Sequence, residues 1–244
     1  AHPLKKKVFK FFEDLAISFC DAMITVNKSI AEIYHQRTGV QPVQILNCPN
    51  YVQLNPQKYW HSLFHLSPQQ KVFIYQGLFS KGRGLEDLIN AFSQLSENYV
   101  LVLMGKGPLE AFLRGKAEKL PNVFIHNFTA AQDMLNYTAS ADFGIVPTEL
   151  IGLNNTLSLP NKYFEYLMAG LPLICIDSPE MGYFIKKFQC GTTFSKNSPE
   201  DILNSIERIV TEDYSQLKNR ALDVAKNYCW ETQEPKLLEI YENL

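Results

Sequence analysis

The chain has 244 residues, of which 46% are hydrophobic, enough for one large domain or for one domain and part of a second. Its formal net charge of −2 gives no bulk electrostatic basis for binding nucleic acid. The five cysteines are scattered and never form a Cys-x-x-Cys pair, which argues against a zinc site and a disulfide framework and favours a reducing, cytoplasmic location. No apolar run approaches the roughly 20 residues of a membrane span.

The N-terminal segment, residues 4–18, is expected to form an amphipathic helix, because its apolar residues recur at helical spacing between lysines. One interpretation is a basic helix that makes peripheral contact with the inner face of a membrane. The other, which we prefer because amphipathic helices usually face a core, is a surface helix that packs its apolar stripe on a domain. The chain begins without Met or a signal-peptide pattern, so we expect a fragment or a processed piece. The lysines are Lys5, Lys6, Lys7 and Lys10.

A short strand–helix–strand unit follows this helix. Residues 21–26 and 43–46 have the composition of strands. Between them, Asn27 can cap a helix that Gly39 terminates. Residues 47–60 carry Asn, Pro and Tyr without periodicity and are expected to form a linker.

From residue 71 onward, apolar strands alternate with amphipathic helices. This alternation predicts an α/β fold, a Rossmann-like, doubly wound parallel sheet with flanking helices. Ligands of such sheets bind beyond the carboxyl ends of the strands, so the loops that follow the strands are the place to expect a site. The C-terminal residues 215–244 are expected to be helical except around 230–235. The expected strands are 72–77, 99–105, 123–128, 142–147, 171–177 and 191–194, and the expected helices are 85–95, 108–120, 130–141, 162–170 and 199–210.

Two glycine loops could carry chemistry. In loop 77–84, glycines would let backbone amides approach a phosphate at a helix N-terminus, and Lys81 and Arg83 add cationic donors. The loop is neither a Walker loop nor a Gly-x-Gly-x-x-Gly fingerprint, and the same composition suits a purely structural corner. Loop 105–108 is equally compatible with a tight turn before a helix that starts with proline.

Glu165 stands alone in an otherwise apolar helix, which Pro160 can begin and Gly170 can end as a left-handed cap. A carboxylate among core residues is costly unless something pairs with it, so Glu165 is an anomaly that needs an explanation. The preceding loop 147–162 is polar and long, and loops of this length in compact domains are usually functional or mobile. No cluster of residues has metal-ligand spacing, so we expect no metal.

Six segments, taken in order, resemble the family-4 (group 1) type glycosyltransferases of the GT-B fold. The resemblance implies two Rossmann-like domains that face a cleft, with a nucleotide-sugar donor bound by the C-terminal one. Residues 1–50 would be the end of the acceptor domain, 51–228 the donor-binding domain, and 229–244 a helix that crosses back. No cofactor is implied, since the nucleotide-sugar, linked to UDP or GDP, is a substrate. The segments are FIYQGLFSKGRGLEDLINAF, VLMGKGPLEAFL, NVFIHNF, MLNYTASADFGIVPTE, LPNKYFEYLMAGLPLI and CGTTF.

The resemblance also assigns roles to residues. Glu165 matches the glutamate that binds the donor ribose hydroxyls. Gly77 and Arg83 match the phosphate loop, and Lys162 matches a position near the diphosphate. Catalytic residues stay unassigned, because part of that machinery belongs to the acceptor domain. Further possible donor-binding residues are Lys81, Asn127, Phe128, Glu149 and Asn161, of which the backbone at 127–128 matches the segment along the nucleobase.

Two positions depart from the family pattern. Leu78 stands where the family often has Arg, and Leu157 stands where a glutamate eight residues before Glu165 is usual. Because of these departures, the residues that would contact the donor sugar are less well defined by the resemblance than those that would contact the nucleotide. Glu149 is a possible substitute for the missing glutamate.

The implied function is metal-independent, retaining hexosyl transfer from a nucleotide-sugar to a glycan or lipid-linked acceptor, in glycan or polysaccharide biosynthesis. Because most of the acceptor domain is missing, we expect this chain alone to bind nucleotide weakly and to transfer little or nothing. One alternative is another GT-B enzyme, such as a nucleotide-sugar 2-epimerase. A second is a non-catalytic interaction module, suggested by Leu78 and Leu157. A hydride-transfer enzyme is disfavoured, because no Gly-x-Gly-x-x-Gly with a downstream acidic residue is present.

Overall fold

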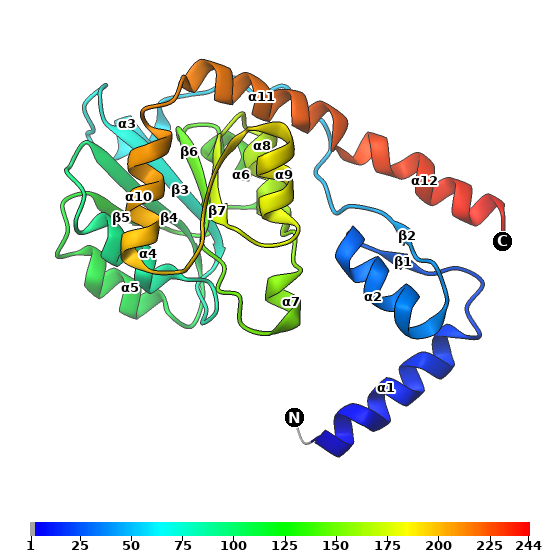
Figure 1. The fold of residues 1–244 in the computed structure, drawn as a ribbon. Helices are drawn as coiled ribbons and strands as arrows, with labels where there is room; N and C mark the ends of the chain where they lie inside the picture. Colours follow the sequence, from blue (N-terminus) through cyan, green and yellow to red (C-terminus); the bar gives the residue numbers. More distant parts are fainter. Residues whose placement is uncertain (1–2) are drawn as a thin grey trace.

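The computed structural model describes residues 3–244, apart from the side chains of Pro3, Lys6 and Ala131. Its larger part is a parallel sheet with the strand order β5-β4-β3-β6-β7-β8 (Figure 1). The order turns back between β3 and β6, as in a doubly wound sheet. The predicted α/β fold class is therefore confirmed. The strands are β3 (Lys71–Leu78), β4 (Tyr99–Lys106), β5 (Val123–His126), β6 (Phe143–Val146), β7 (Leu173–Ile176) and β8 (Gly191–Phe194).

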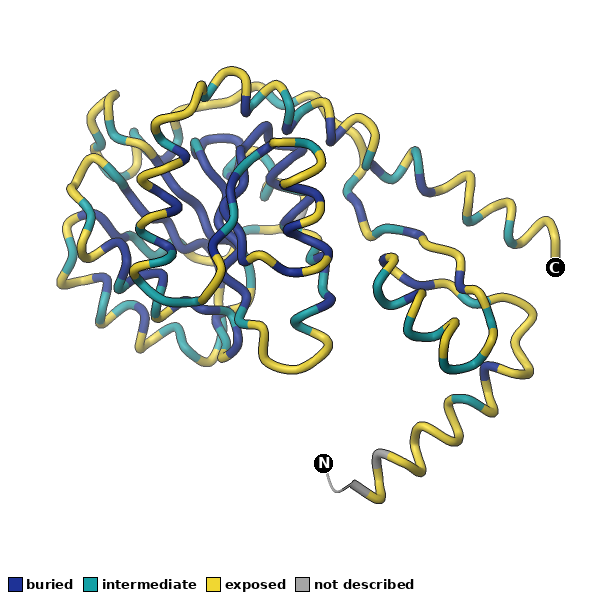
Figure 2. The backbone as a smooth tube through the Cα atoms, viewed as in Figure 1, coloured by how far each residue is buried: buried dark blue, intermediate teal, exposed yellow. Residues whose placement is uncertain are grey.

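Helices flank this sheet in two groups, and the sheet between them is the most buried part of the chain (Figure 2). Parallel strands covered on both faces read as continuous apolar runs, which is why these strands were recognisable in the sequence. One group comprises α4 (Leu85–Phe92), α5 (Glu110–Ala117) and α10 (Pro199–Ile209). The other comprises α6 (Ala131–Thr138), α8 (Asn161–Met168), α9 (Met181–Phe188) and α11 (Tyr214–Asn227).

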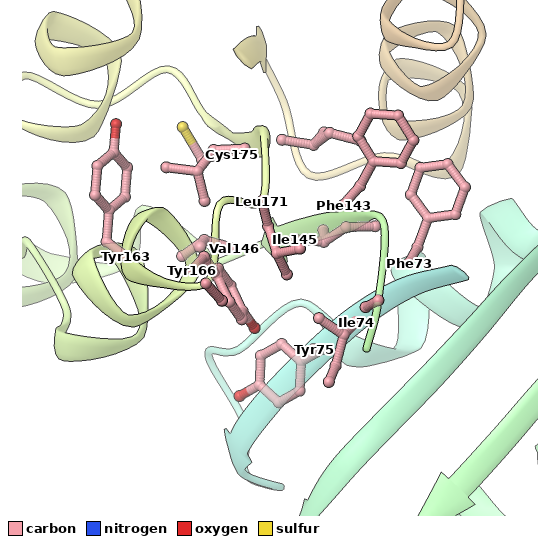
Figure 3. Close-up of a cluster of buried hydrophobic side chains, with 14 of the residues drawn as sticks. Phe73, Ile74, Tyr75, Phe143, Ile145, Val146, Tyr163, Tyr166, Leu171 and Cys175 are labelled. Atoms are coloured by element: carbon pink, nitrogen blue, oxygen red, sulfur yellow. The ribbon is translucent and has the colours of Figure 1, made fainter. Parts of the chain in front are cut away.

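The core joins the two halves of the sheet to α8 (Figure 3). Phe73 of β3 stacks on Phe143 of β6, with ring centroids 4.8 Å apart. On α8, Tyr163 and Tyr166 are fully buried aromatic residues of the same cluster. The buried tyrosines and phenylalanines thus fix α8 against β3 and β6, the two strands where the order turns back.

A smaller N-terminal unit contains a two-stranded parallel sheet of β1 (Ile24–Thr25) and β2 (Val43–Gln44), joined by α2 (Lys28–Thr38). Both strands are shorter than the sequence indicates. As predicted, Asn27 caps α2 by accepting from the Ile30 N–H, and Gly39 ends it at a φ of 78°. The side-chain amide of Asn27 also donates to the Leu157 carbonyl at 2.7 Å, which ties this unit to the larger one.

Helix α1 (Pro3–Ile17) is amphipathic, but the expectation that its apolar stripe packs on a domain is wrong for this chain. Phe9 and Phe12 are 74% and 61% exposed. The helix is held from its polar side, where Arg37 of α2 lies 2.7 Å from Glu13 and 2.8 Å from Asp14. The alternative, that α1 contacts a membrane, stays a prediction. Of the four lysines named for that contact, the side chain of Lys6 lies outside the described residues. Among residues 3–244, no helix combines the length and apolar content needed to cross a bilayer.

Several short elements differ from the sequence-based expectation. Helix α3 (Tyr59–Leu63) begins inside the expected linker, α7 (Gly152–Thr156) interrupts the long loop, and α9 was not anticipated. Helix α12 (Trp230–Glu242) runs through the predicted break and contains Pro235, which removes one backbone hydrogen bond without ending the helix. Its Gln233 side chain accepts from the Leu46 N–H at 3.1 Å, so tertiary contact helps to hold α12 in place.

Candidate functional site

The candidate site lies at the carboxyl ends of β3 and β6, where the strand order turns back. In open α/β sheets this is the crevice in which ligands bind. The loops that follow the two strands meet here. The Glu149 N–H donates to the Gly82 carbonyl at 3.1 Å, and the Asn155 side chain donates to the Glu149 carbonyl at 3.1 Å. The long loop is therefore anchored on the glycine loop that precedes α4.

Lys162 sits in the second position of α8, and its ammonium group lies against Gly77. Gly77 has a φ of 131°, and a Cβ built there would come within 2.9 Å of the Lys162 Nζ. The Nζ also lies 3.8 Å from the ring centroid of Tyr75, a cation–π contact. Glycine is thus needed at position 77 for two reasons, the backbone angle and the space taken by Lys162.

Arg83 is a second cation of this region, since its charge acts on Lys162. Burial, followed by the nearby charge of Arg83, lowers the pKa of Lys162 to about 7, and Glu165 partly offsets the shift. In the described part of the chain, neither Lys162 nor Arg83 forms an ion pair. Two neighbouring cations without a paired anion favour an anionic ligand, and a phosphate is the group that lysine and arginine bind together most readily.

Glu165 lies three residues further along α8 and is partly buried. Its Oε2 accepts a hydrogen bond from the Gln76 side-chain amide at 2.5 Å. Burial raises the pKa of Glu165, while the Gln76 hydrogen bond and the Lys162 charge act against that rise. The other carboxylate oxygen has no partner among the described residues. A hydroxyl group of a ligand can therefore donate to it.

Behind Glu165 stands a buried polar network that the sequence analysis missed. Gln76 and Thr138 are 2% and 0% exposed, and the Thr138 hydroxyl donates to the Gln76 side-chain oxygen at 2.6 Å. The Gln76 N–H donates to the Tyr166 hydroxyl at 2.8 Å. One signal was present in the sequence, since Gln76 interrupts the apolar run that begins at Val72 and directly precedes Gly77. Nothing in the sequence marked Thr138.

Glu149 belongs to the start of α4 rather than to the cluster around Glu165. Its Oε1 accepts from the Gly84 N–H at 3.1 Å, and Gly84, with a φ of 65°, is the N-cap of that helix. A carboxylate at a helix N-terminus is favourable. Lys81 and Asn161 are exposed, and their side chains form no hydrogen bond or ion pair with any described residue.

Asn127 and Phe128 lie beyond the end of β5, and β4 separates them from Gly77. The Asn127 side-chain oxygen accepts from Arg114 at 2.7 Å. Phe128 is half exposed, and the Lys106 Nζ lies 4.6 Å from its ring centroid. These residues share the sheet edge with Lys162 and Glu165 but not their immediate cluster.

The second glycine loop has a structural explanation. A Cβ at Gly105 would overlap the Gly77 carbonyl, and one at Gly107 would overlap the backbone of Phe79. The Phe79 N–H donates to the Lys106 carbonyl at 2.8 Å, which closes the two loops on each other. Of the two interpretations left open by the sequence, close packing accounts for these glycines.

The two departures from the family pattern lie in different surroundings. Leu78 is half exposed at the end of β3, opposite Lys106 of β4. Leu157 is buried, and its carbonyl accepts the hydrogen bond from Asn27. Position 157 therefore serves the contact between the two units. Residues 3–244 contain no group of three or more His, Cys, Asp or Glu side chains placed to hold a metal.

The model of the family described as glycosyl transferases group 1 matches residues 61–227. Chitobiosyldiphosphodolichol beta-mannosyltransferase from Candida albicans is 25% identical over 267 residues, with 99% of this chain and 57% of that protein covered. The chain thus spans a little more than half the length of this relative.

Solved structures show the same fold at low sequence identity. HepE from Anabaena, solved in complex with UDP, superposes with a TM-score of 0.76 at 14% identity, covering 91% of this chain and 64% of that one. Sucrose-phosphate synthase from Thermosynechococcus elongatus gives a TM-score of 0.74 at 19% identity, covering 95% and 60%. At these identities the likeness establishes the fold, which is the Rossmann-like domain of GT-B proteins.

Proposed function

Because the chain belongs to the group 1 glycosyltransferases, as the family resemblance of its six segments predicted, we propose that it is the donor-binding part of a retaining, nucleotide-sugar-dependent transferase. The observation that carries this proposal is the cluster at Gly77, where Lys162 lies against the Gly77 backbone and feels the charges of Arg83 and Glu165, while no ion pair among the described residues engages Lys162 or Arg83. A nucleoside diphosphate supplies both features the cluster lacks, a phosphate for the cations and ribose hydroxyls for the carboxylate.

The chemistry follows from these positions. As the bond from the sugar to the diphosphate breaks, negative charge develops on the leaving phosphate. Lys162, Arg83 and the N-terminus of α8 would stabilise that charge without a metal. Glu165 would hold the ribose and so fix the distance between the nucleotide and the reacting sugar. UDP or GDP is the proposed nucleotide, and the UDP present in the HepE complex supports the first.

The acceptor side is proposed to be largely supplied by further polypeptide. Residues 1–50 would be the end of an acceptor domain, 51–228 the donor domain, and 229–244 a helix returning to the acceptor side. Two observations support this division. The apolar stripe of α1 is uncovered, and the matched region makes up 57% of the Candida albicans relative. The chain alone would therefore bind nucleotide weakly and transfer little.

The proposed reaction is hexosyl transfer in glycan or polysaccharide biosynthesis, to a glycan or a lipid-linked acceptor. The name of the Candida albicans relative, a mannosyltransferase acting on a diphosphodolichol-linked sugar, supports the lipid-linked choice. A cytoplasmic location, with peripheral contact at the inner membrane face, is part of the same proposal. The five cysteines, all of them free, are compatible with a reducing compartment.

Calorimetric titration with UDP, GDP and ADP tests the donor site. The wild-type chain should bind at least one of them, and Glu165→Ala should weaken that binding about ten-fold or more, because hydrogen bonds to a charged group are among the stronger ones. Glu207→Ala, an exposed carboxylate on α10, is the matched control and should bind as the wild type does. No response to any nucleotide, or equal binding by Glu165→Ala, would refute the site.

Product analysis with the longer protein separates the remaining alternatives. A transferase yields a glycoside whose anomeric configuration, read by NMR, matches that of the donor if the reaction is retaining. A nucleotide-sugar 2-epimerase would instead release a free, altered sugar. A non-catalytic module would give neither product nor nucleotide binding.

A further inference from the structure

We propose that Gln76 is the positioning residue of this site and that its side-chain amide, fixed by Thr138, orients the Glu165 carboxylate toward the ligand. This inference rests on the proposed function, since it assumes that Glu165 accepts hydrogen bonds from a bound nucleotide. Gln76 itself is too deeply buried to reach a ligand, being 2% exposed. Its influence on the ligand must therefore pass through Glu165, to which its amide donates at 2.5 Å.

The backbone of Gln76 is held by an unusual partner. β3 pairs with β6 only at Phe73 and Ile74, so beyond them the N–H on this edge of β3 has no strand to bond. The Tyr166 hydroxyl takes the place of a strand and accepts from the Gln76 N–H at 2.8 Å. Its ring, drawn beside Tyr75 in Figure 3, passes over Gly144 of β6, where any Cβ would overlap it. Because Gly144 has no side chain, the Tyr166 ring has room to reach the backbone of Gln76.

The side chain of Gln76 is fixed as well. In this structure the Thr138 hydroxyl donates to the amide oxygen at 2.6 Å, and the amide nitrogen faces Glu165. An amide N–H next to a carboxylate stabilises its ionised form, and only the ionised form leaves all its oxygen lone pairs free to accept. Two ribose hydroxyls can then donate to a Glu165 carboxylate that is already ionised and oriented toward the ligand.

The same atoms accommodate a protonated Glu165 if the amide turns over. The Thr138 hydroxyl lies 2.8 Å from the Met134 carbonyl and can donate there while it accepts from the turned amide. The Glu165 O–H would then donate to the Gln76 oxygen. The orientation of Gln76 and the charge of Glu165 are therefore linked. The other groups that face Glu165 are the Lys162 ammonium, which also favours the charged form, and the Tyr166 hydroxyl.

Replacing the Gln76 amide by an apolar group of similar size distinguishes a positioning role of this residue from a role in packing alone. Gln76→Met removes the donor and keeps the approximate volume. UDP and GDP affinity would be titrated from about pH 5.5 to about pH 8.5, a range that spans the titration of a carboxyl with a raised pKa. We expect affinity to fall about ten-fold or more, and the pH below which binding is lost to move upward, because Glu165 then stays protonated to a higher pH. Gln94→Met, on the exposed surface, is the control.

Thr138 supplies a second and gentler pair of variants. Thr138→Val keeps the shape but cannot hold the amide oxygen, so it should shift the pH profile in the same direction as Gln76→Met, by a smaller amount. Thr138→Ser retains the hydroxyl and should restore the wild-type profile. These variants test the inference even if Gln76→Met fails to fold.

Direct titration of Glu165 by carboxyl ¹³C NMR in the nucleotide-free chain makes the test independent of ligand binding. The pKa of Glu165 should be higher in Gln76→Met and in Thr138→Val than in the wild type. An unchanged pKa, or wild-type nucleotide binding with an unchanged pH profile in both variants, would overturn the role of Gln76 while leaving the donor site intact. A wild-type chain that binds no nucleotide would overturn the donor site and this inference together.

Discussion

Lys162 lies over the face of Tyr75, with its Nζ 3.8 Å from the ring centroid, and the same Nζ lies 2.9 Å from where a Cβ at Gly77 would stand. The aromatic face attracts the ammonium group, whereas burial and the charge of Arg83 disfavour it and bring the pKa of Lys162 to about 7. The nucleotide-free site therefore contains a lysine that is only partly protonated near neutral pH. An arriving anion would change that balance.

Nucleoside diphosphate binding should accordingly be accompanied by proton uptake. A bound diphosphate moves the pKa of Lys162 from about 7 toward its ordinary value of 10.5, so between these values the complex holds more protons than the free chain. Affinity should fall as the pH rises above about 7. Calorimetry with UDP at about pH 8, in buffers of different ionisation enthalpy, measures the uptake directly.

Two variants isolate the lysine as the source of these protons. Lys162→Arg keeps a charge that does not titrate in this range and should bind without proton uptake. Lys119→Met removes an exposed lysine outside the candidate site and should take up protons as the wild type does. Equal uptake by Lys162→Arg and the wild type would contradict the assignment.

A methyl group at Gly77 should damage the site. Gly77→Ala would meet both a φ of 131° and the Lys162 ammonium, so we expect a loss of about 1–3 kcal/mol in the free energy of unfolding and at least about ten-fold weaker UDP binding. Gly115→Ala is the matched control. Its Cβ would enter open space within α5, and a gain of about 0.5–1 kcal/mol is expected. Urea denaturation of both variants would show opposite signs, and a stable Gly77→Ala with wild-type affinity would be incompatible with this geometry.

The uncovered stripe of α1 makes a simple prediction about stability. Phe9→Ser should change the free energy of unfolding by no more than about 0.5 kcal/mol, because the ring is 74% exposed. Phe92→Ala, in the fully buried part of α4, should cost about 3–5 kcal/mol. If Phe9→Ser destabilised the chain by several kcal/mol in chemical denaturation, α1 would have to be packed against this chain after all.

The sheet was predictable because its signal is local. Buried parallel strands such as β3 and β4 are continuous apolar runs, and α10 shows its amphipathic face and its Ser198 cap in consecutive residues. The five-residue helix α7 is too short to show such a pattern, and its Asn155 side chain donates to the distant Gly82 carbonyl. Helix α9 does have an amphipathic pattern, with Phe184 and Ile185 on its buried face, and was overlooked. Pro235 was misleading because a helix already fixed by Gln233 can accept one proline.

The candidate site was predictable only in part. Glu165 stood out as a charge in an apolar helix, and the structure places Lys162 and Gly77 beside each other, a contact that no pattern in the sequence could reveal. Thr138 and Gln76 are 62 residues apart, and a threonine at the end of a helix has no local feature that points to a strand. Residues that support a site without touching the ligand are identified by their tertiary contacts and not by their spacing in the sequence.

Asn27 lies at the junction between the two units and bonds to both. Asn27 is 1% exposed, and its side chain makes two hydrogen bonds. Its amide nitrogen donates to the Leu157 carbonyl, and its amide oxygen accepts from the Ile30 N–H. Asn27→Asp keeps the oxygen that caps α2 but replaces the donor with a second acceptor opposite a carbonyl. It should therefore cost about 1–3 kcal/mol while leaving the cap intact.

The neighbouring contact gives the readout. The Ser29 N–H donates to Glu180 at 2.7 Å across the same junction, so its amide hydrogen should exchange faster in Asn27→Asp, whereas the amide of Ile30 should stay protected. Asn27→Ala removes both bonds and should expose both amides. Hydrogen exchange followed by mass spectrometry would resolve the two patterns. Unchanged exchange at Ser29 in Asn27→Asp would mean that Glu180 alone holds the units together, and Glu180→Gln would then be the variant that separates them.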